Sequence, residues 1–192
     1  MNPQKIVCMG DSLSEGYGIR QGCCWPSILH HILPHVFINS GISGDTTAGM
    51  LARFHEMVIS HKPEYVIIMG GTNDISFNVP YNQIIGNIVA MTRLARHHNI
   101  QSIIGLLPPF FIPKEYEDDS LFVDMPVLYK RLIEYQVTLH KFIIVDEQPA
   151  IDFSKNMYPD LYLNDGLHPN EKGHKVMAEN AKEQLVRIFE AK

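Results

Sequence analysis

Short runs of apolar, mostly β-branched residues recur along the chain, and longer stretches with helical spacing separate them. Because predicted strands and helices alternate in this way, the pattern indicates an α/β fold with a parallel sheet. Apolar residues at consecutive positions also fit strands that are buried on both faces. The predicted strands are residues 6–9, 36–39, 65–69, 102–107 and 142–145, and the predicted helices are residues 25–33, 47–60, 80–98, 126–140 and 169–190.

We therefore expect one domain over residues 1–192, a three-layer α/β/α sandwich around a five-stranded parallel sheet. The sequence contains no internal repeat, linker or low-complexity tract that would divide it. No apolar run is long enough to cross a bilayer, so no transmembrane segment is expected.

Charge and cysteine content narrow the classes of function. The formal net charge is -5 and the charges are scattered. Since nucleic-acid binding normally requires a basic stripe, no nucleic-acid partner is expected. The three cysteines, Cys8, Cys23 and Cys24, are odd in number, which favours free thiols and a cytoplasmic location. A periplasmic or secreted location stays open, because a removed signal peptide would leave no trace.

Polar sequences follow the first three predicted strands. Ser12 lies in a Gly-Asp-Ser-Leu sequence after the first strand, Gly44 in Ser-Gly-Asp-Thr after the second, and Asn73 in Gly-Gly-Thr-Asn-Asp after the third. In an open parallel sheet the carboxyl ends of the strands form one edge, and ligands bind in the crevice beyond it. Residues far apart in the sequence are therefore expected to meet in one site.

A carboxylate and a histidine near the other end complete a candidate catalytic set. Asp165 precedes His168 by three residues, so one turn can hold the carboxylate against one ring nitrogen while the other faces Ser12. A serine hydroxyl becomes a good nucleophile when an imidazole takes its proton and a carboxylate orients that imidazole. The alternative is a surface aspartate that caps the following helix, beside a histidine without a special role.

These four blocks, in this order, resemble those of the GDSL, or SGNH, hydrolase family, whose second name gives the Ser, Gly, Asn and His found here. The resemblance spans nearly the whole chain and implies the flavodoxin-like fold of these hydrolases. The first block and the short length are most similar to the bacterial thioesterase, protease and lysophospholipase subgroup. The resemblance implies Ser12 as the nucleophile, His168 as the base and Asp165 as the carboxylate that orients it.

The resemblance also implies an oxyanion hole made by the backbone N–H groups of Ser12 and Gly44 and the side-chain amide of Asn73. Such donors stabilise the tetrahedral intermediate of acyl transfer. Glycine suits its position because no Cβ hinders the approach of a ligand to the backbone. The alternatives are a turn glycine and a turn-capping asparagine. Three aspartates of the same turns are expected to bond nearby backbone rather than to transfer protons: Asp11, Asp45 and Asp74.

Two further features bear on ligands. Phe110 and Phe111 follow the fourth predicted strand and bring apolar bulk to the same edge, where they either line an acyl pocket or cover the sheet. His55, Glu56 and His61 have the residue types of a zinc protease, but the two histidines are six positions apart, which places them on different faces of a helix. No metal site and no cofactor are predicted.

The sequence thus predicts a serine hydrolase that cleaves small acyl esters or thioesters, of the esterase, lipase, lysophospholipase or thioesterase type, through an acyl-enzyme intermediate. The expected partner is a small-molecule substrate, and the oligomeric state stays open, a monomer included. A carbohydrate O-deacetylase with the same machinery is the alternative within the enzymes. A catalytically silent binding protein on the same fold is the alternative outside them, and the complete catalytic set argues against it.

Overall fold

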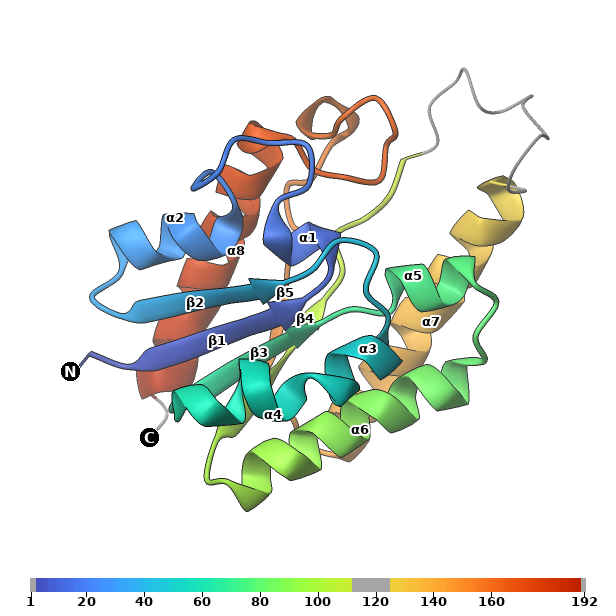
Figure 1. Ribbon diagram of the computed structural model, residues 1–192. Coiled ribbons are helices and arrows are strands. Elements are labelled where there is room, and N and C mark those ends of the chain that lie inside the picture. Colours follow the sequence, from blue (N-terminus) through green and yellow to red (C-terminus); the bar gives the residue numbers. More distant parts are fainter. Residues whose placement is uncertain (1–2, 112–124, 191–192) are drawn as a thin grey trace.

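The computed structural model describes residues 3–111 and 125–190, and a parallel β-sheet forms its centre (Figure 1). The strand order is β2-β1-β3-β4-β5, and every neighbouring pair is parallel. The five-stranded parallel sheet predicted from the sequence is confirmed. The strands are β1 (Lys5–Gly10), β2 (Val36–Gly41), β3 (Tyr65–Met69), β4 (Gln101–Leu106) and β5 (Ala150–Asp152).

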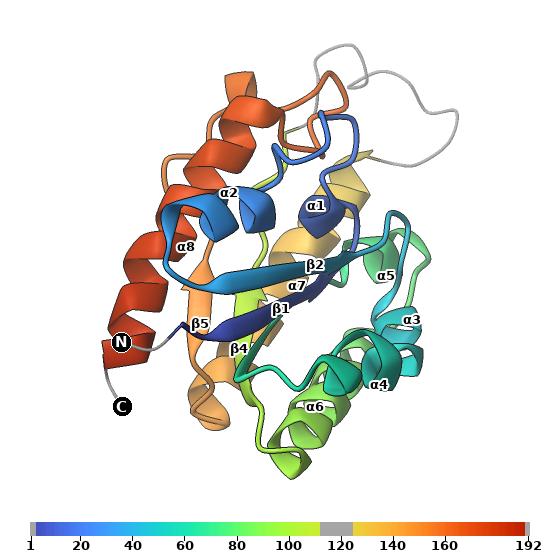
Figure 2. The ribbon, with the colours of Figure 1, turned by 60° about the vertical axis from the view of Figure 1, so that its left-hand side comes forward.

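Helices cover both faces of this sheet (Figures 1 and 2). On one face lie α2 (Trp25–Ile32) and α8 (Glu171–Glu190). On the other lie α3 (Thr47–Ala52), α4 (Phe54–Met57), α6 (Tyr81–His97) and α7 (Met125–Val145). Within the described ranges no helix is both long enough and apolar enough to span a membrane. The described residues also form the short helices α1 (Ser12–Glu15), η1 (Ile59–His61), α5 (Thr72–Ser76) and η3 (Pro159–Leu161).

The core occupies both sides of the sheet, as the continuous apolar strands require. All five residues of β3 are buried. On one face the Trp25 ring packs against Phe153, with ring centroids 4.9 Å apart. On the other face α6 buries Ile84, Ile88 and Met91, which recur at helical spacing.

The predicted strand at residues 142–145 is wrong, because these residues form the last turn of α7. The true fifth strand comes later and has only three residues, of which Ile151 alone is buried. A short apolar run does not by itself distinguish a strand from a helix. In this protein residues 142–145 are helical, and the side chains of Ile144 and Val145 are largely exposed.

The ends of two predicted helices also differ from the structure. The predicted helix at residues 47–60 is three short elements, because the chain leaves helical geometry at Arg53 and again at Val58. The last helix begins at Glu171 rather than Pro169, since Asn170 caps it by accepting the N–H groups of the second and third helical residues.

His174 is a buried titratable residue of α8 whose side chain contacts the start of α2. It is 1% exposed, and its Nδ1 accepts the backbone N–H of Trp25 at 3.3 Å. Burial lowers the pKa of His174 to about 4, and the nearby His168 lowers it further in the same direction. The imidazole is therefore neutral in the folded protein at neutral pH.

This burial predicts a loss of stability in acid. Between the unfolded pKa near 6.5 and the folded pKa near 4, the unfolded chain binds more protons at this residue, so stability is complete above the higher value and falls as pH drops toward the lower. The expected loss is about 3 kcal/mol for a shift of this size. Urea unfolding at several pH values will measure it, and His174→Gln will flatten the dependence. The control His97→Gln changes an exposed histidine, and an equal flattening there would contradict the assignment.

Candidate active site

The three polar sequences predicted to converge do lie at one edge of the sheet, beyond the carboxyl ends of β1, β2 and β3 (Figure 1). Ser12 is the first residue of α1, directly after β1. The Asp11 side chain caps this helix by accepting the N–H of Leu13 at 3.0 Å. Because the N–H of the first residue of a helix has no intrahelical partner, the backbone donor of Ser12 also lies at this edge.

Ser12, His168 and Asp165 form a continuous hydrogen-bonded series. The Oγ atom of Ser12 lies 2.9 Å from Nε2 of His168. The Nδ1 atom of the same ring lies 2.7 Å from Oδ2 of Asp165. The Ser12 hydroxyl and the Asp165 carboxylate are thus each within direct hydrogen-bond reach of the same imidazole, the arrangement that a serine nucleophile requires.

Backbone contacts hold the carboxylate of Asp165 in place. Its Oδ1 atom accepts the N–H groups of Leu167 and His168, both at 2.9 Å. Partial burial raises the pKa of Asp165, but the hydrogen bonds from the His168 side chain and from these two N–H groups lower it by more, so the pKa lies below its ordinary value. An ionised Asp165 only accepts, so Nδ1 of His168 carries the proton and Nε2 presents a lone pair to Ser12.

An aromatic ring borders the imidazole. The Tyr17 and His168 ring centroids lie 4.6 Å apart, and Tyr17 is half-exposed. Sequence reasoning missed this residue. It occurs in the first block, five residues after Ser12, and only the fold shows that it reaches the histidine from the other end of the chain.

The two remaining oxyanion candidates lie on neighbouring segments. Asn73 is on α5, and its Nδ2 donates one hydrogen to the backbone oxygen of Asp45 at 2.8 Å, which leaves the second N–H of this amide for another acceptor. Gly44 directly precedes Asp45 and has φ = 78°. A Cβ on Gly44 would meet no atom within 4 Å, so the left-handed backbone, rather than crowding within the protein, is what requires glycine.

The three aspartates of these turns differ in their roles. Asp11 bonds local backbone, as expected, and burial raises its pKa to about 7. Asp74 accepts the N–H and the hydroxyl of Thr47 at 2.8 and 2.6 Å. The expectation for Asp45 is wrong, because its carboxylate forms an ion pair with Arg53, Oδ2 to Nε, at 2.7 Å.

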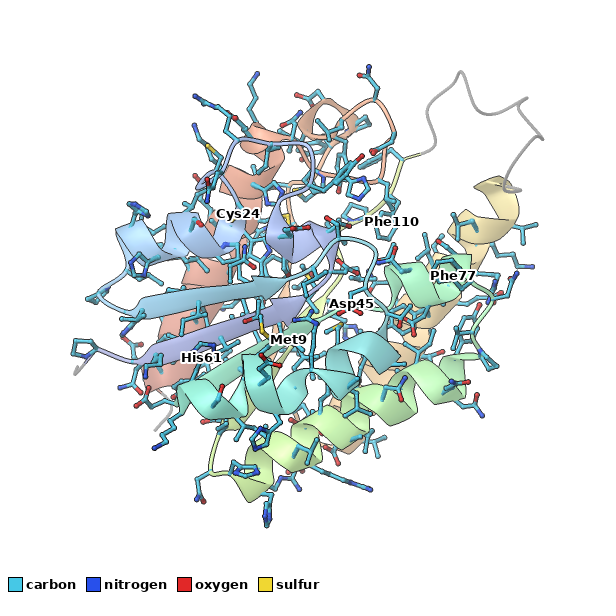
Figure 3. The ribbon with its side chains drawn as sticks, viewed as in Figure 1. Met9, Cys24, Asp45, His61, Phe77 and Phe110 are labelled. Carbon is cyan, nitrogen blue, oxygen red and sulfur yellow. The ribbon has the colours of Figure 1, made fainter. Side chains whose placement is uncertain are left out.

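Phe110 and Phe111 lie in different surroundings. Phe110 is buried and lines a cavity of about 570 Å³ between the end of β4 and α7, together with Leu132. None of the residues of the hydrogen-bonded series lines this cavity. Phe111 packs edge-on against Tyr162 with ring centroids 5.0 Å apart. Figure 3 shows Phe110 and Asp45 at the side of the sheet toward which β1 and β2 run.

In residues 3–111 and 125–190, no group of three or more His, Cys, Asp or Glu side chains is arranged to hold a metal ion. The three cysteines are free thiols, and Cys8 and Cys24 are buried.

The structure is thus a three-layer α/β fold whose sheet edge brings a serine into contact with a histidine. Residues 8–176 match the GDSL-like lipase/acylhydrolase family, and the chain belongs to this family. It is therefore an esterase or acylhydrolase of the GDSL type.

Characterised relatives support this assignment along most of the chain. An arylesterase of Vibrio mimicus is 33% identical and aligns over 96% of this chain and 89% of its own length. An acetylxylan esterase of Geobacillus stearothermophilus is 30% identical, over 91% and 90%. The thioesterase 1/protease 1/lysophospholipase L1 of Escherichia coli is 26% identical, over 94% and 82%.

Solved structures agree on the fold. A lipolytic protein of the G-D-S-L family from Desulfitobacterium hafniense superposes with a TM-score of 0.80 at 24% identity, covering 94% of this chain and 99% of that one.

Proposed function

We propose that the protein hydrolyses small acyl esters or thioesters through a covalent acyl-enzyme, with Ser12 as the nucleophile. The observation that carries this proposal is the 2.9 Å contact between Ser12 Oγ and His168 Nε2, on a histidine whose other nitrogen is bound by Asp165. This contact places the hydroxyl proton next to its acceptor before any substrate arrives.

In the first half-reaction, Ser12 Oγ attacks the carbonyl carbon while its proton moves to Nε2 of His168. The imidazolium that forms is stabilised by the ionised Asp165. The carbonyl oxygen becomes an oxyanion, and we assign its stabilisation to the N–H groups of Ser12 and Gly44 and to the second N–H of the Asn73 amide. Collapse of this intermediate expels the alcohol or thiol, which takes the proton from His168.

In the second half-reaction, water takes the place of the leaving group. His168 accepts a proton from the water as it attacks the acyl-Ser12 ester, and the same donors hold the second oxyanion. The proton on Nε2 then returns to Ser12 Oγ as the acid departs. Each proton that His168 takes up in one step it returns in the next, so the enzyme is regenerated.

Two candidate substrate classes differ in the group that leaves: a simple alcohol or thiol, or a carbohydrate hydroxyl. Simple esters and thioesters are our first choice, because relatives of that type include an arylesterase and a thioesterase. Removal of acetyl groups from carbohydrates is the second. The acetylxylan esterase relative favours it, as does the half-exposed Tyr17 ring beside His168, on which a sugar could stack.

A substrate panel will separate these classes. Nitrophenyl acetate, butyrate and octanoate, octanoyl-CoA and acetylated xylo-oligosaccharides are compared by kcat/KM. We expect the nitrophenyl esters or the thioester to be hydrolysed faster than the acetylated sugar. A preference for the sugar would favour the deacetylase, and no hydrolysis of any compound would contradict the proposed function.

The same panel tests the predicted role of Phe110 and Phe111 in acyl binding. Each buried methylene is worth about 0.8 kcal/mol, or roughly fourfold in rate. Alanine at a residue that contacts the acyl chain should therefore reduce kcat/KM for octanoate at least tenfold more than for acetate. If only Phe110→Ala lowers kcat/KM selectively for octanoate, the acyl chain of the substrate binds in the cavity beside α7. Equal losses on both esters in both variants would show that the pair is structural.

A further inference from the structure

Arg53 ties three separate segments of the active-site edge together. Its Nε donates to Oδ2 of Asp45 at 2.7 Å, its Nη1 to the backbone oxygen of Ser40 at 2.8 Å, and its Nη2 to the backbone oxygen of Gly10 at 2.9 Å. These acceptors belong to the loop after β2, to β2 itself and to the end of β1. The side chains of the ion pair are only 15% and 13% exposed.

The backbone conformation at Arg53 turns its side chain toward these three acceptors. The residue stands between α3 and α4, with φ and ψ of −97° and 6°, so the helix is interrupted where the guanidinium turns toward the sheet. A planar guanidinium can serve three acceptors in fixed directions, which the single ammonium group of a lysine does not reproduce.

The partners of Arg53 lead directly to the groups that we assign to catalysis. Gly10 is two residues before Ser12. Asp45 follows Gly44, and the backbone oxygen of Asp45 accepts a hydrogen from the Asn73 amide. Arg53 is thus one contact away from the nucleophile turn and two contacts away from the side-chain donor of the oxyanion hole.

We propose that Arg53 and Asp45 are positioning residues that set the orientation of the oxyanion donors Asn73 and Gly44. The inference rests on the proposed acyl-enzyme function. A donor must lie within hydrogen-bond distance of the oxyanion in the transition state, and small misplacements cost catalysis rather than substrate binding. The ion pair with Arg53 holds the loop that contains Asp45, and the backbone oxygen of Asp45 in turn holds the side-chain amide of Asn73.

Gly49 of α3 supplies an independent observation. A Cβ on Gly49 would lie 1.9 Å from Oδ1 of Asp45, so only glycine leaves room for the carboxylate in its paired position. The three atoms nearest to this Cβ all belong to Asp45, so Gly49→Ala displaces the Asp45 carboxylate while the Arg53, Asn73 and Ser12 side chains keep their identity. In a helix, alanine is otherwise more favourable than glycine. The substitution thus separates loss of positioning from loss of intrinsic helix stability.

The experiment measures kcat and KM for nitrophenyl acetate in three variants, with active sites counted by fluorophosphonate labelling. We expect Arg53→Met to lower kcat about a hundredfold and Gly49→Ala about tenfold, each with KM changed by less than about threefold. The control Arg96→Met removes an exposed arginine that lies 3.8 Å from Asp146, and it should leave both constants unchanged. Thermal unfolding of every variant is recorded in parallel.

A double-variant cycle tests whether the effect passes through Asn73. If it does, Gly49→Ala will lower kcat much less in an Asn73→Ala background than in the native enzyme. An equal fall in both backgrounds, or a lower melting temperature with kcat per active site unchanged, would overturn the proposal. Should Arg53→Met fail to fold, the Gly49→Ala cycle decides alone. Activity that survives Ser12→Ala would instead reject the acyl-enzyme function, a separate outcome.

Discussion

Ser12→Ala is expected to lower kcat for nitrophenyl acetate about a millionfold, because loss of the nucleophile removes the acyl-enzyme route altogether. The residual rate should come from the oxyanion donors and from substrate binding, which the substitution leaves in place. The contact of Ser12 Oγ with His168 is the hydrogen bond that the alanine removes, so the fold should persist with nearly native stability.

Fluorophosphonate labelling gives a second measurement of the same residue. The native enzyme should be labelled at Ser12 alone, since this serine pairs with an imidazole. The control Ser60→Ala changes an exposed serine in η1, whose hydroxyl bonds the backbone oxygen of Glu56, and it should leave labelling and hydrolysis intact. Labelling of Ser12→Ala at the native rate would show that another residue is the nucleophile.

The strands that the sequence predicts well are those whose residues are buried on both faces. The predicted strand at residues 65–69 coincides with β3, and the predicted strands at residues 6–9 and 102–107 differ from β1 and β4 only at their ends. A fully buried strand requires apolar residues at every position, so the signal in the sequence is strong.

The fifth strand lacked such a signal. With three residues and one buried side chain, β5 is too short to produce a pattern, whereas the end of α7 carries four consecutive apolar residues. The helix exposes two of them, Ile144 and Val145, and no local rule predicts exposed β-branched residues at a helix end. Tertiary context decided between the two states.

The candidate site divides in a similar way. Ser12, Asn73 and the Asp165–His168 pair have residue types suited to catalysis and lie at strand ends or at a three-residue spacing, so the local sequence identifies them as candidates. Arg53 does not, because its role depends on partners such as Gly10, 43 positions away. One signal was present: Arg53 stands inside the apolar run from Met50 to Phe54, where a charge needs a partner in the fold.

The largest effect expected after that of Ser12 concerns Asp165, where asparagine should lower kcat about ten thousandfold at neutral pH. The reason lies in the two backbone N–H groups of Leu167 and His168 that bond Oδ1. These two N–H groups require an acceptor, so in Asp165→Asn the amide oxygen would occupy the position of Oδ1. The NH2 group of the asparagine would then face Nδ1 of His168. The ring would then carry its proton on Nε2 and present a donor to Ser12, the wrong tautomer for a base.

This reasoning distinguishes an orienting carboxylate from a simple loop cap. The backbone bonds survive in Asp165→Asn, so a residue that only caps the turn would tolerate the change with little loss of kcat. The matched control Asp160→Asn makes the same chemical change at an exposed position in η3 and should keep native kcat. Because the pKa of Asp165 lies below its ordinary value, native enzyme should keep its ionised carboxylate from pH 5 upward, and the variant deficit should be measurable throughout that range. A kcat within about tenfold of native for Asp165→Asn would remove Asp165 from the triad and leave a Ser12–His168 dyad as the catalytic unit.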